Sequence, residues 1–255
     1  MRTLVAIPAF NEEASIGPVL DGLAAYHPLA DVVVVDDGSH DRTSAIARAA
    51  GVRVLRHAIN LGVGGAMGTA FRYAARHGYE VLIQFDADGQ HRPEYIAALR
   101  DAVGTADIAI GSRYASSDGY QSTAGRRVVH RTIARVASLY ARTRLTDATS
   151  GFRAAGPRAI AIFSAHYPVE WLGDTVESIV LASRQRLTFR EVPIVMNERA
   201  GGVPSQSFVR AALYTGRILF ILGLASIRSV PPRIAELRRR SAREDRAKKR
   251  EAPAG

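Results

Sequence analysis

Short apolar runs alternate with helical patterns along the first 110 residues of the chain. The runs lie at residues 4–7, 32–35, 52–55, 81–85 and 107–110, and the second is four consecutive valines. Continuous rather than alternating apolar runs are typical of parallel strands that are buried on both faces. Between them, apolar positions at helical spacing predict helices over residues 13–26, 41–50, 64–77 and 93–103.

Repeated strand–helix units imply right-handed crossovers, so the pattern predicts an α/β fold with a mostly parallel sheet and helices on both faces. The second half is less regular. Its pattern predicts helices over residues 126–145 and 174–186, short strands over 151–153 and 187–192, and a polar loop over 197–207. We expect a single folded domain over residues 1–207, an amphipathic helix within 208–230 and a basic, disordered tail over 231–255.

Composition narrows the class of protein. A chain of 255 residues with 47% hydrophobic and 23% charged residues is too apolar to be disordered. The absence of cysteine excludes disulfides and cysteine-ligated metal centres. Residues 228–255 hold ten Arg or Lys against four Asp or Glu, a net of +6, which leaves +4 of the total +10 for the preceding 227 residues. No aromatic residues are interleaved with these basic residues, so we do not expect nucleic-acid binding.

Acidic residues follow three of the predicted strands. In parallel sheets, ligands bind beyond the carboxyl ends of the strands, so these residues are candidates for ligand binding or catalysis. Glu12 and Glu13 follow the first run, Asp36 and Asp37 follow the second, and Asp86 and Asp88 follow the fourth. Side chains two apart on an extended segment point to the same side, where two carboxylates repel unless a cation lies between them. Carboxylate oxygens suit Mg²⁺ or Mn²⁺, and Gln90 offers a further oxygen.

A glycine-rich segment over residues 60–68 follows the third strand. It differs from a dinucleotide-binding fingerprint, because it does not follow the first strand and its last glycine is displaced. We expect a loop near a bound nucleotide, with Gly64 allowing close approach of the backbone; the alternative is a tightly packed entry into a helix.

Five motifs occur in a fixed order: Ile-Pro-Ala-Phe-Asn-Glu at 7–12, Val-Asp-Asp-Gly-Ser at 35–39, Asp-Ala-Asp-Gly-Gln-His at 86–91, Gly-Ser-Arg-Tyr at 111–114 and Thr-Ser-Gly-Phe-Arg at 149–153. Over residues 3–210, this set resembles the family 2 glycosyltransferases, and within them the dolichyl-phosphate mannose synthase-like, or polyprenyl-phosphate glycosyltransferase, branch. The resemblance implies a GT-A fold, a nucleotide-sugar donor, a divalent metal and inversion at the anomeric carbon.

The resemblance also implies roles for individual residues. Asp86, Asp88 and Gln90 match metal ligands. The loop over residues 197–207 matches a loop that closes on the donor phosphates, and Arg199 would make that contact. The lysine that the branch usually has in this loop is missing, and Pro204, Ser205 and Gln206 occupy its place. With the glycine-rich segment included, the expected nucleotide-sugar site comprises Pro8, Phe10, Glu12, Val34, Asp36, Asp37, Gly64, Asp86, Ala87, Asp88, Arg199 and Ser205.

The acceptor decides which further residues are needed. A sugar hydroxyl must lose a proton to a positioned carboxylate, whereas a lipid phosphate, with a second pKa near ~6, is already largely ionised. Asp88, Glu177 and Asp147 are the catalytic candidates, although an acidic residue early in a helix, such as Glu177, also stabilises the helix dipole. Four arginines are candidates for binding an acceptor phosphate: Arg113, Arg126, Arg127 and Arg131. The alternative is that they form only a solvated cationic face.

The longest apolar stretch late in the chain, residues 218–227, is shorter than the about 20 residues needed to span a bilayer. Pro8 and the acidic residues after it interrupt the first apolar run, so no signal peptide is expected. Together with the basic tail, residues 208–230 predict peripheral contact with the inner, cytoplasmic face of the membrane, and a small integral membrane subunit is a further expected partner.

The leading hypothesis is therefore a hexosyltransferase with a polyprenyl-phosphate acceptor. The alternatives are a sugar-hydroxyl acceptor and a non-catalytic nucleotide-binding subunit.

Overall fold

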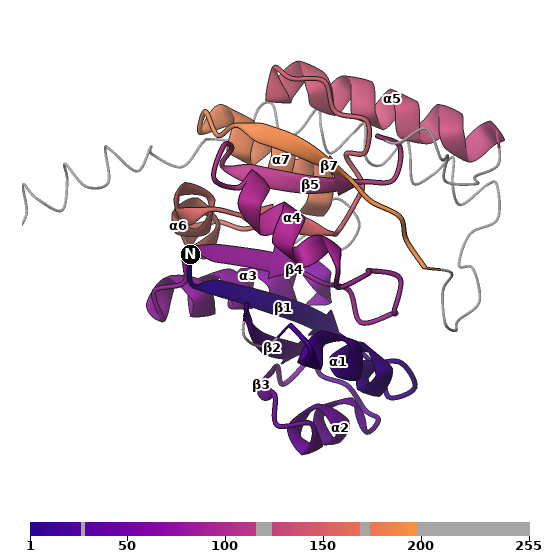
Figure 1. Ribbon diagram of the computed structural model, residues 1–255, viewed down its shortest axis with the longest axis vertical. Coiled ribbons are helices and arrows are strands. Elements are labelled where there is room, and N and C mark those ends of the chain that lie inside the picture. Colours follow the sequence, from indigo (N-terminus) through magenta and orange to yellow (C-terminus); the bar gives the residue numbers. More distant parts are fainter. Residues whose placement is uncertain (27–28, 116–123, 169–173, 198–255) are drawn as a thin grey trace, which may run out of the picture.

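The computed structural model describes residues 1–26, 29–115, 124–168 and 174–197 (Figure 1). In this part of the chain, seven strands form one sheet in the order β3-β2-β1-β4-β6-β5-β7. Their bounds are β1 (Thr3–Ala9), β2 (Asp31–Asp36), β3 (Arg53–Arg56), β4 (Val81–Gln84), β5 (Ile108–Ser112), β6 (Arg153–Ala155) and β7 (Phe189–Pro193).

The sheet is parallel except at β6. Strand β1 pairs in parallel with β2 and β4, and β5 pairs in parallel with β7. Strand β6 runs antiparallel between β4 and β5, with Ala154 opposite both Ile83 and Ala109. Because β6 runs the opposite way, the residues before it lie at the edge where the neighbouring strands end.

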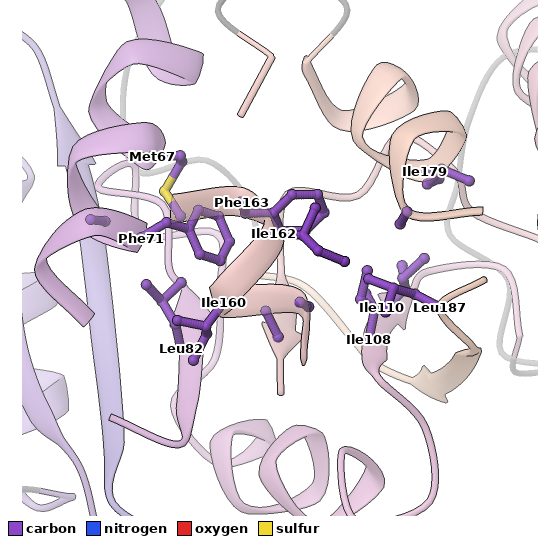
Figure 2. Packing of buried hydrophobic residues seen from close by; sticks show 14 of the residues in the cluster. Met67, Phe71, Leu82, Ile108, Ile110, Ile160, Ile162, Phe163, Ile179 and Leu187 are labelled. Atoms are coloured by element: carbon purple, nitrogen blue, oxygen red, sulfur yellow. The ribbon is translucent and has the colours of Figure 1, made fainter. Parts of the chain in front are cut away.

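Helices cover both faces of the sheet, as the sequence predicts. On one face pack α1 (Ile16–Ala24), α2 (Thr43–Ala49) and α4 (Tyr95–Ala102), through a core that includes Ile7, Leu20 and Leu99. On the other face pack α3 (Gly62–Arg76), α5 (Ala124–Ala141), α6 (Pro157–Ala165) and α7 (Asp174–Arg184). Figure 2 shows part of this second core, where the Phe71 and Phe163 rings meet at 5.0 Å between their centroids.

The glycine-rich segment is not a loop. Helix α3 begins at Gly62, so the segment enters a helix, as in the alternative, and the expectation of a loop is wrong. A nucleotide contact at Gly64 stays a prediction. The Asp37 carboxylate accepts the backbone N–H groups of Leu61 (2.9 Å) and Gly62 (2.7 Å), and this satisfies donors that a helix start leaves unpaired. Gly64 is consequently buried within the first turns of the helix.

Helix α6 is absent from the sequence prediction. Its nine residues are almost all apolar or small, so no polar face marked them as a helix. The other helices and strands predicted within residues 1–192 are found with ends shifted by a few residues, as at α1, which starts at Ile16 after a turn rather than at residue 13.

Within the described residues, no helix has both the length and the apolar character needed to cross a membrane. Arg199, Ser205, the predicted amphipathic segment 208–230 and the tail 231–255 lie outside the described residues.

Candidate active site

The expected motifs meet at one edge of the sheet. Strands β1, β2, β4 and β5 all end there, and β6 begins there, so the segments that follow or precede them converge (Figure 1). Sequence separation is large, but the parallel topology places these segments side by side.

The loops after β1 and β2 are joined by hydrogen bonds between backbone and side chains. The Asn11 N–H donates to Ser39 Oγ at 3.0 Å, and the Glu12 N–H donates to Thr43 Oγ1 at 2.8 Å. In the opposite direction, the His40 N–H donates to Asn11 Oδ1 at 2.9 Å. The two loops therefore form one rigid unit at the sheet edge.

The residues expected around a nucleoside divide into an accessible and a buried group. Phe10 is 38% exposed, and Pro8 and Glu12 are half-buried. Val34 and Asp36 are fully buried, so in this arrangement a ligand does not reach their side chains, and a nucleoside contact by either stays a prediction. The accessible surface is therefore formed by the first loop.

Asp36 and Asp37 instead support the loops from beneath. Asp36 accepts the Ser39 N–H at 2.8 Å and the Ser44 hydroxyl, and Arg56 lies 3.6 Å away. Burial acts to raise the pKa of Asp36, but these hydrogen bonds and the Arg56 charge outweigh burial and lower it. Asp37 is engaged by the start of α3 and by His57, whose Nδ1 lies 2.7 Å from Oδ1.

The two aspartates after β4 lie in a turn, not on an extended segment. The strand ends at Gln84, residues 87 and 88 form a turn, and Gly89 has a φ of 78°. The Gln90 N–H bonds to Asp88 Oδ1 at 3.0 Å and fixes the turn. The alternation of side chains expected for an extended segment therefore does not apply to Asp86 and Asp88.

Asp86 presents a partly accessible carboxylate, with 37% of its side chain exposed. Ala87, which follows it, is buried in the core and anchors the turn. Within the described residues, no three or more acidic or histidine side chains are grouped closely enough to hold a metal ion by themselves. Two carboxylates and an amide oxygen do fit Mg²⁺ or Mn²⁺, which take one or two protein carboxylates and complete their shell with water and substrate phosphates.

His91 is buried directly behind this turn, with 3% of its surface exposed. Its ring stacks on Phe152, with centroids 4.4 Å apart and an interplanar angle of 12°. Burial lowers the pKa of His91, although Asp86 and Asp88 act to raise it and Arg113 contributes to lowering it. The Asp86 N–H donates to His91 Nδ1 at 2.9 Å, so this nitrogen serves as an acceptor.

Arg113 and Asp147 form a two-pronged ion pair at the end of β5. Arg113 Nε donates to Asp147 Oδ2 at 2.6 Å and its Nη2 donates to Oδ1 at 2.9 Å. The Asp147 side chain is fully buried, and that of Arg113 is 16% exposed. Glu191 of β7 holds the same loop by accepting the N–H groups of Thr146 (2.7 Å) and Asp147 (2.9 Å). The structure thus joins a predicted phosphate ligand to a predicted catalytic carboxylate.

The remaining candidates lie on α5 and α7. Arg126 and Arg127 belong to the first turn of α5, and Arg131, one turn further, is exposed. Glu177 is buried on α7. The N-terminal end of α7 is tied to the site because Arg153 Nη1 donates to the Thr175 carbonyl at 2.6 Å, while its Nη2 and Nε donate to the carbonyls of Ala148 (2.6 Å) and Ser150 (2.7 Å).

Comparison with known proteins accounts for this arrangement. The sequence pattern described as Glycosyl transferase family 2 matches residues 4–165, more than half of the chain. The chain belongs to this family. It is a glycosyltransferase with a GT-A fold, and the expected family and fold are confirmed.

Two relatives are similar over most of their length. An undecaprenyl-phosphate mannosyltransferase of Micrococcus luteus is 36% identical over 225 residues, 81% of this chain and 88% of the relative. A polyprenol monophosphomannose synthase of Mycolicibacterium smegmatis is 33% identical over 232 residues, 84% of each chain. Among solved structures, glucosyl-3-phosphoglycerate synthase of Mycobacterium tuberculosis, in complex with phosphoglyceric acid, matches with a TM-score of 0.67 at 19% identity, over 91% of this chain and 81% of that one.

Several supporting residues of this glycosyltransferase were not assigned a role from the sequence. Gln84 had a detectable signal, because it is the polar residue in an otherwise apolar strand and lies two positions before Asp86. His91 stands inside a recognised motif, but nothing in the sequence shows that it is buried. Arg153 is the last residue of the fifth motif, but the sequence does not show which carbonyls it bonds, and Glu191 gave no local signal, because its contacts join distant segments.

Gly151 leaves room for the Asp86 carboxylate. A Cβ atom at this position would lie 3.0 Å from Asp86 Oδ2 and 3.0 Å from Gln84 Nε2. We expect Gly151→Ala to displace that carboxylate and to lower transferase kcat/KM by about 10–100-fold, the range found when the surroundings of a metal ligand are disturbed. The matched control is Gly17→Ala, whose Cβ would meet only Ile46 at an ordinary 3.7 Å and which should retain full activity. Equal activity of the two variants would contradict the expectation.

The Arg113–Asp147 pair predicts a pH dependence of stability. Burial acts to raise the pKa of Asp147, but the hydrogen bonds and charge of Arg113 outweigh it and hold this pKa below its ordinary 3.8. A lowered pKa contributes stability that is fully present above pH 3.8 and is lost as the pH falls through the folded-state pKa. Urea unfolding between pH 2 and 5 should show a weaker acid-induced loss in Asp147→Asn than in the unchanged protein. An identical slope in both would show that Asp147 does not contribute.

Proposed function

We propose that this glycosyltransferase moves a hexose from a nucleoside diphosphate sugar to a polyprenyl phosphate, with inversion at the anomeric carbon. The observation that carries the proposal is similarity above 30% identity, over more than four-fifths of the chain, to two enzymes named for this acceptor class. The placement of Asp86, Asp88 and Gln90 at the carboxyl edge of the sheet supports the same reaction.

In the proposed step, an oxygen of the lipid phosphate attacks the anomeric carbon as the bond from that carbon to the diphosphate breaks. The bonding electrons leave with the nucleoside diphosphate, and the product is a glycosyl phosphate lipid. The acceptor phosphate is already ionised near neutral pH, so the step requires no protein base. This agrees with the engagement of Asp147 by Arg113, which leaves it occupied as an ion-pair partner.

Asp86, Asp88 and Gln90 would hold Mg²⁺ or Mn²⁺. Such a cation, when bound, neutralises the negative charge that develops on the departing diphosphate. Pro8, Phe10 and Glu12 provide the accessible surface for the nucleoside, and Arg199 and Ser205, outside the described residues, are proposed to contact the donor.

The acceptor phosphate is proposed to bind to the arginines of α5. Arg113 already compensates the charge of Asp147, so a second anion depends chiefly on Arg126, Arg127 and Arg131. We also propose peripheral contact of residues 208–255 with the inner face of the membrane, supported by the +6 charge of residues 228–255, and a small integral membrane subunit as a partner.

The test is transfer of label into lipid. The full chain is mixed with Mn²⁺ or Mg²⁺, liposomes that contain polyprenyl phosphate and a panel of radiolabelled nucleotide sugars, and the organic phase is counted. Metal-dependent label that is lost in Asp88→Asn is the expected result. Release of nucleoside diphosphate with label only in the aqueous phase would replace the lipid acceptor by a hydroxyl acceptor. No reaction with any donor in either phase would overturn the proposal.

A further inference from the structure

The carboxylate of Asp86 is contacted from two sides, by a hydrogen bond from Gln84 and by the ring of His91. Gln84 of β4, which is 5% exposed, donates from Nε2 to Asp86 Oδ1 at 3.1 Å. His91 lies on the other side, with Nε2 3.4 Å from Asp86 Oδ2. Each carboxylate oxygen thus faces a different donor, and Gly151 closes a third side.

His91 contacts Asp86 through both of its ring nitrogens. Its Nδ1 accepts the backbone N–H of Asp86 at 2.9 Å, so in the neutral ring the proton is on Nε2, the atom that faces the carboxylate. The ring is clamped by Phe152, on which it stacks, and by Phe85, which it meets edge-on at 5.4 Å and 87°. One immobile side chain therefore fixes the main chain and the side chain of Asp86 together.

This arrangement is more than the turn alone requires. Buried polar side chains carry a desolvation cost unless they are hydrogen-bonded. His91 is buried between Phe85 and Phe152, and Gln84 is buried on the other face of the sheet, where it lines a cavity with Met67 and Phe71. An apolar residue at either position would fill the same space without that cost. What the two polar residues add is control over the orientation of one partly exposed carboxylate.

We propose that His91 and Gln84 are positioning residues that orient the Asp86 carboxylate to bind the divalent cation and, with it, the donor diphosphate. This inference rests on the metal site of the proposed function. Groups that orient metal ligands typically contribute 10–100-fold to metal affinity.

Mn²⁺ binding to the full chain provides the test, with free Mn²⁺ measured by electron paramagnetic resonance and no sugar donor present. His91→Phe keeps a ring that stacks on Phe152 but removes both nitrogens, and we expect it to weaken the Mn²⁺ Kd by about 10–100-fold. His91→Asn restores an acceptor near the Nδ1 position and should recover part of this loss. The matched control is His77→Phe: His77 also stacks on an aromatic ring, Tyr73, and bonds a backbone carbonyl, and it lies in the C-cap of α3. Its Kd should be unchanged.

Turnover gives a second readout. Because a positioning defect weakens cation binding, the KM for Mn²⁺ should rise in His91→Phe while kcat at saturating Mn²⁺ largely recovers. A folded His91→Phe that binds Mn²⁺ as the unchanged protein does would overturn the inference and leave the proposed function intact. If His91→Phe does not fold, Gln84→Met tests the Oδ1 side by the same criterion. Failure of the unchanged protein to bind Mn²⁺ in an Asp86-dependent way would overturn the metal site itself.

Discussion

Replacing Arg113 by methionine is expected to lower the free energy of unfolding by about 3–5 kcal/mol, the range for removal of one partner of a buried ion pair. The reason is the fully buried Asp147, which would lose a two-pronged partner at 2.6 and 2.9 Å and remain as an uncompensated charge. Urea unfolding at pH 7 measures the effect.

The control for this variant is an arginine–aspartate pair in which the arginine is exposed to solvent. Arg158 donates to Asp107 at 2.9 Å, but its side chain is 57% exposed, so Arg158→Met should cost no more than about 1 kcal/mol. A double variant, Arg113→Met with Asp147→Leu, removes both charges and should recover much of the lost stability. Equal losses in Arg113→Met and Arg158→Met would show that burial of the pair does not matter.

The second large effect is expected at Asp86. Asp86→Ala should lower kcat/KM for sugar transfer by about 10³-fold, which corresponds to roughly 4 kcal/mol of transition-state stabilisation. The change removes the accessible carboxylate to which Gln84 and His91 are directed, while the core beneath it is untouched. Steady-state kinetics with the donor found in the lipid assay provides the measurement.

Asp101→Asn is the matched control for Asp86→Ala. Asp101 lies on α4 with 66% of its side chain exposed, and its ion pair with Arg100 is on the surface. The transfer rate of this variant should equal that of the unchanged protein. Retention of more than about a tenth of the normal activity by Asp86→Ala would contradict a central role for this carboxylate.

The sequence was sufficient to predict the layered fold because its main signals are local. The four valines of β2 form such a signal, because an uninterrupted apolar run indicates a parallel strand that is buried on both faces. Once the strands are parallel, the segments after them meet at one edge, so the general location of the site followed. The antiparallel direction of β6 did not follow, since three residues carry no directional pattern.

The geometry within the site was predicted less well. Asp86 and Asp88 were expected on an extended segment, although Asp88 precedes a glycine, which is a known turn signal. The pairing of Arg113 with Asp147 joins residues 34 positions apart, and the sequence predicts separate roles for them, Arg113 in binding the acceptor phosphate and Asp147 in catalysis. Such pairings depend on where loops pack, and hydrophobic periodicity contains no information about them.

The direction of β6 also has a consequence for how this scaffold varies. The chain leaves the sheet at the end of β5 and re-enters through its hydrogen-bonded neighbour β6 at the same edge. Residues 113–152, including α5, therefore form an excursion whose two ends are anchored side by side. An exchange of this segment that retains Gly151 and Phe152, which contact Asp86 and His91, would replace the arginines of α5 that are proposed to bind the acceptor, while the seven-stranded sheet and the surroundings of Asp86 stay the same.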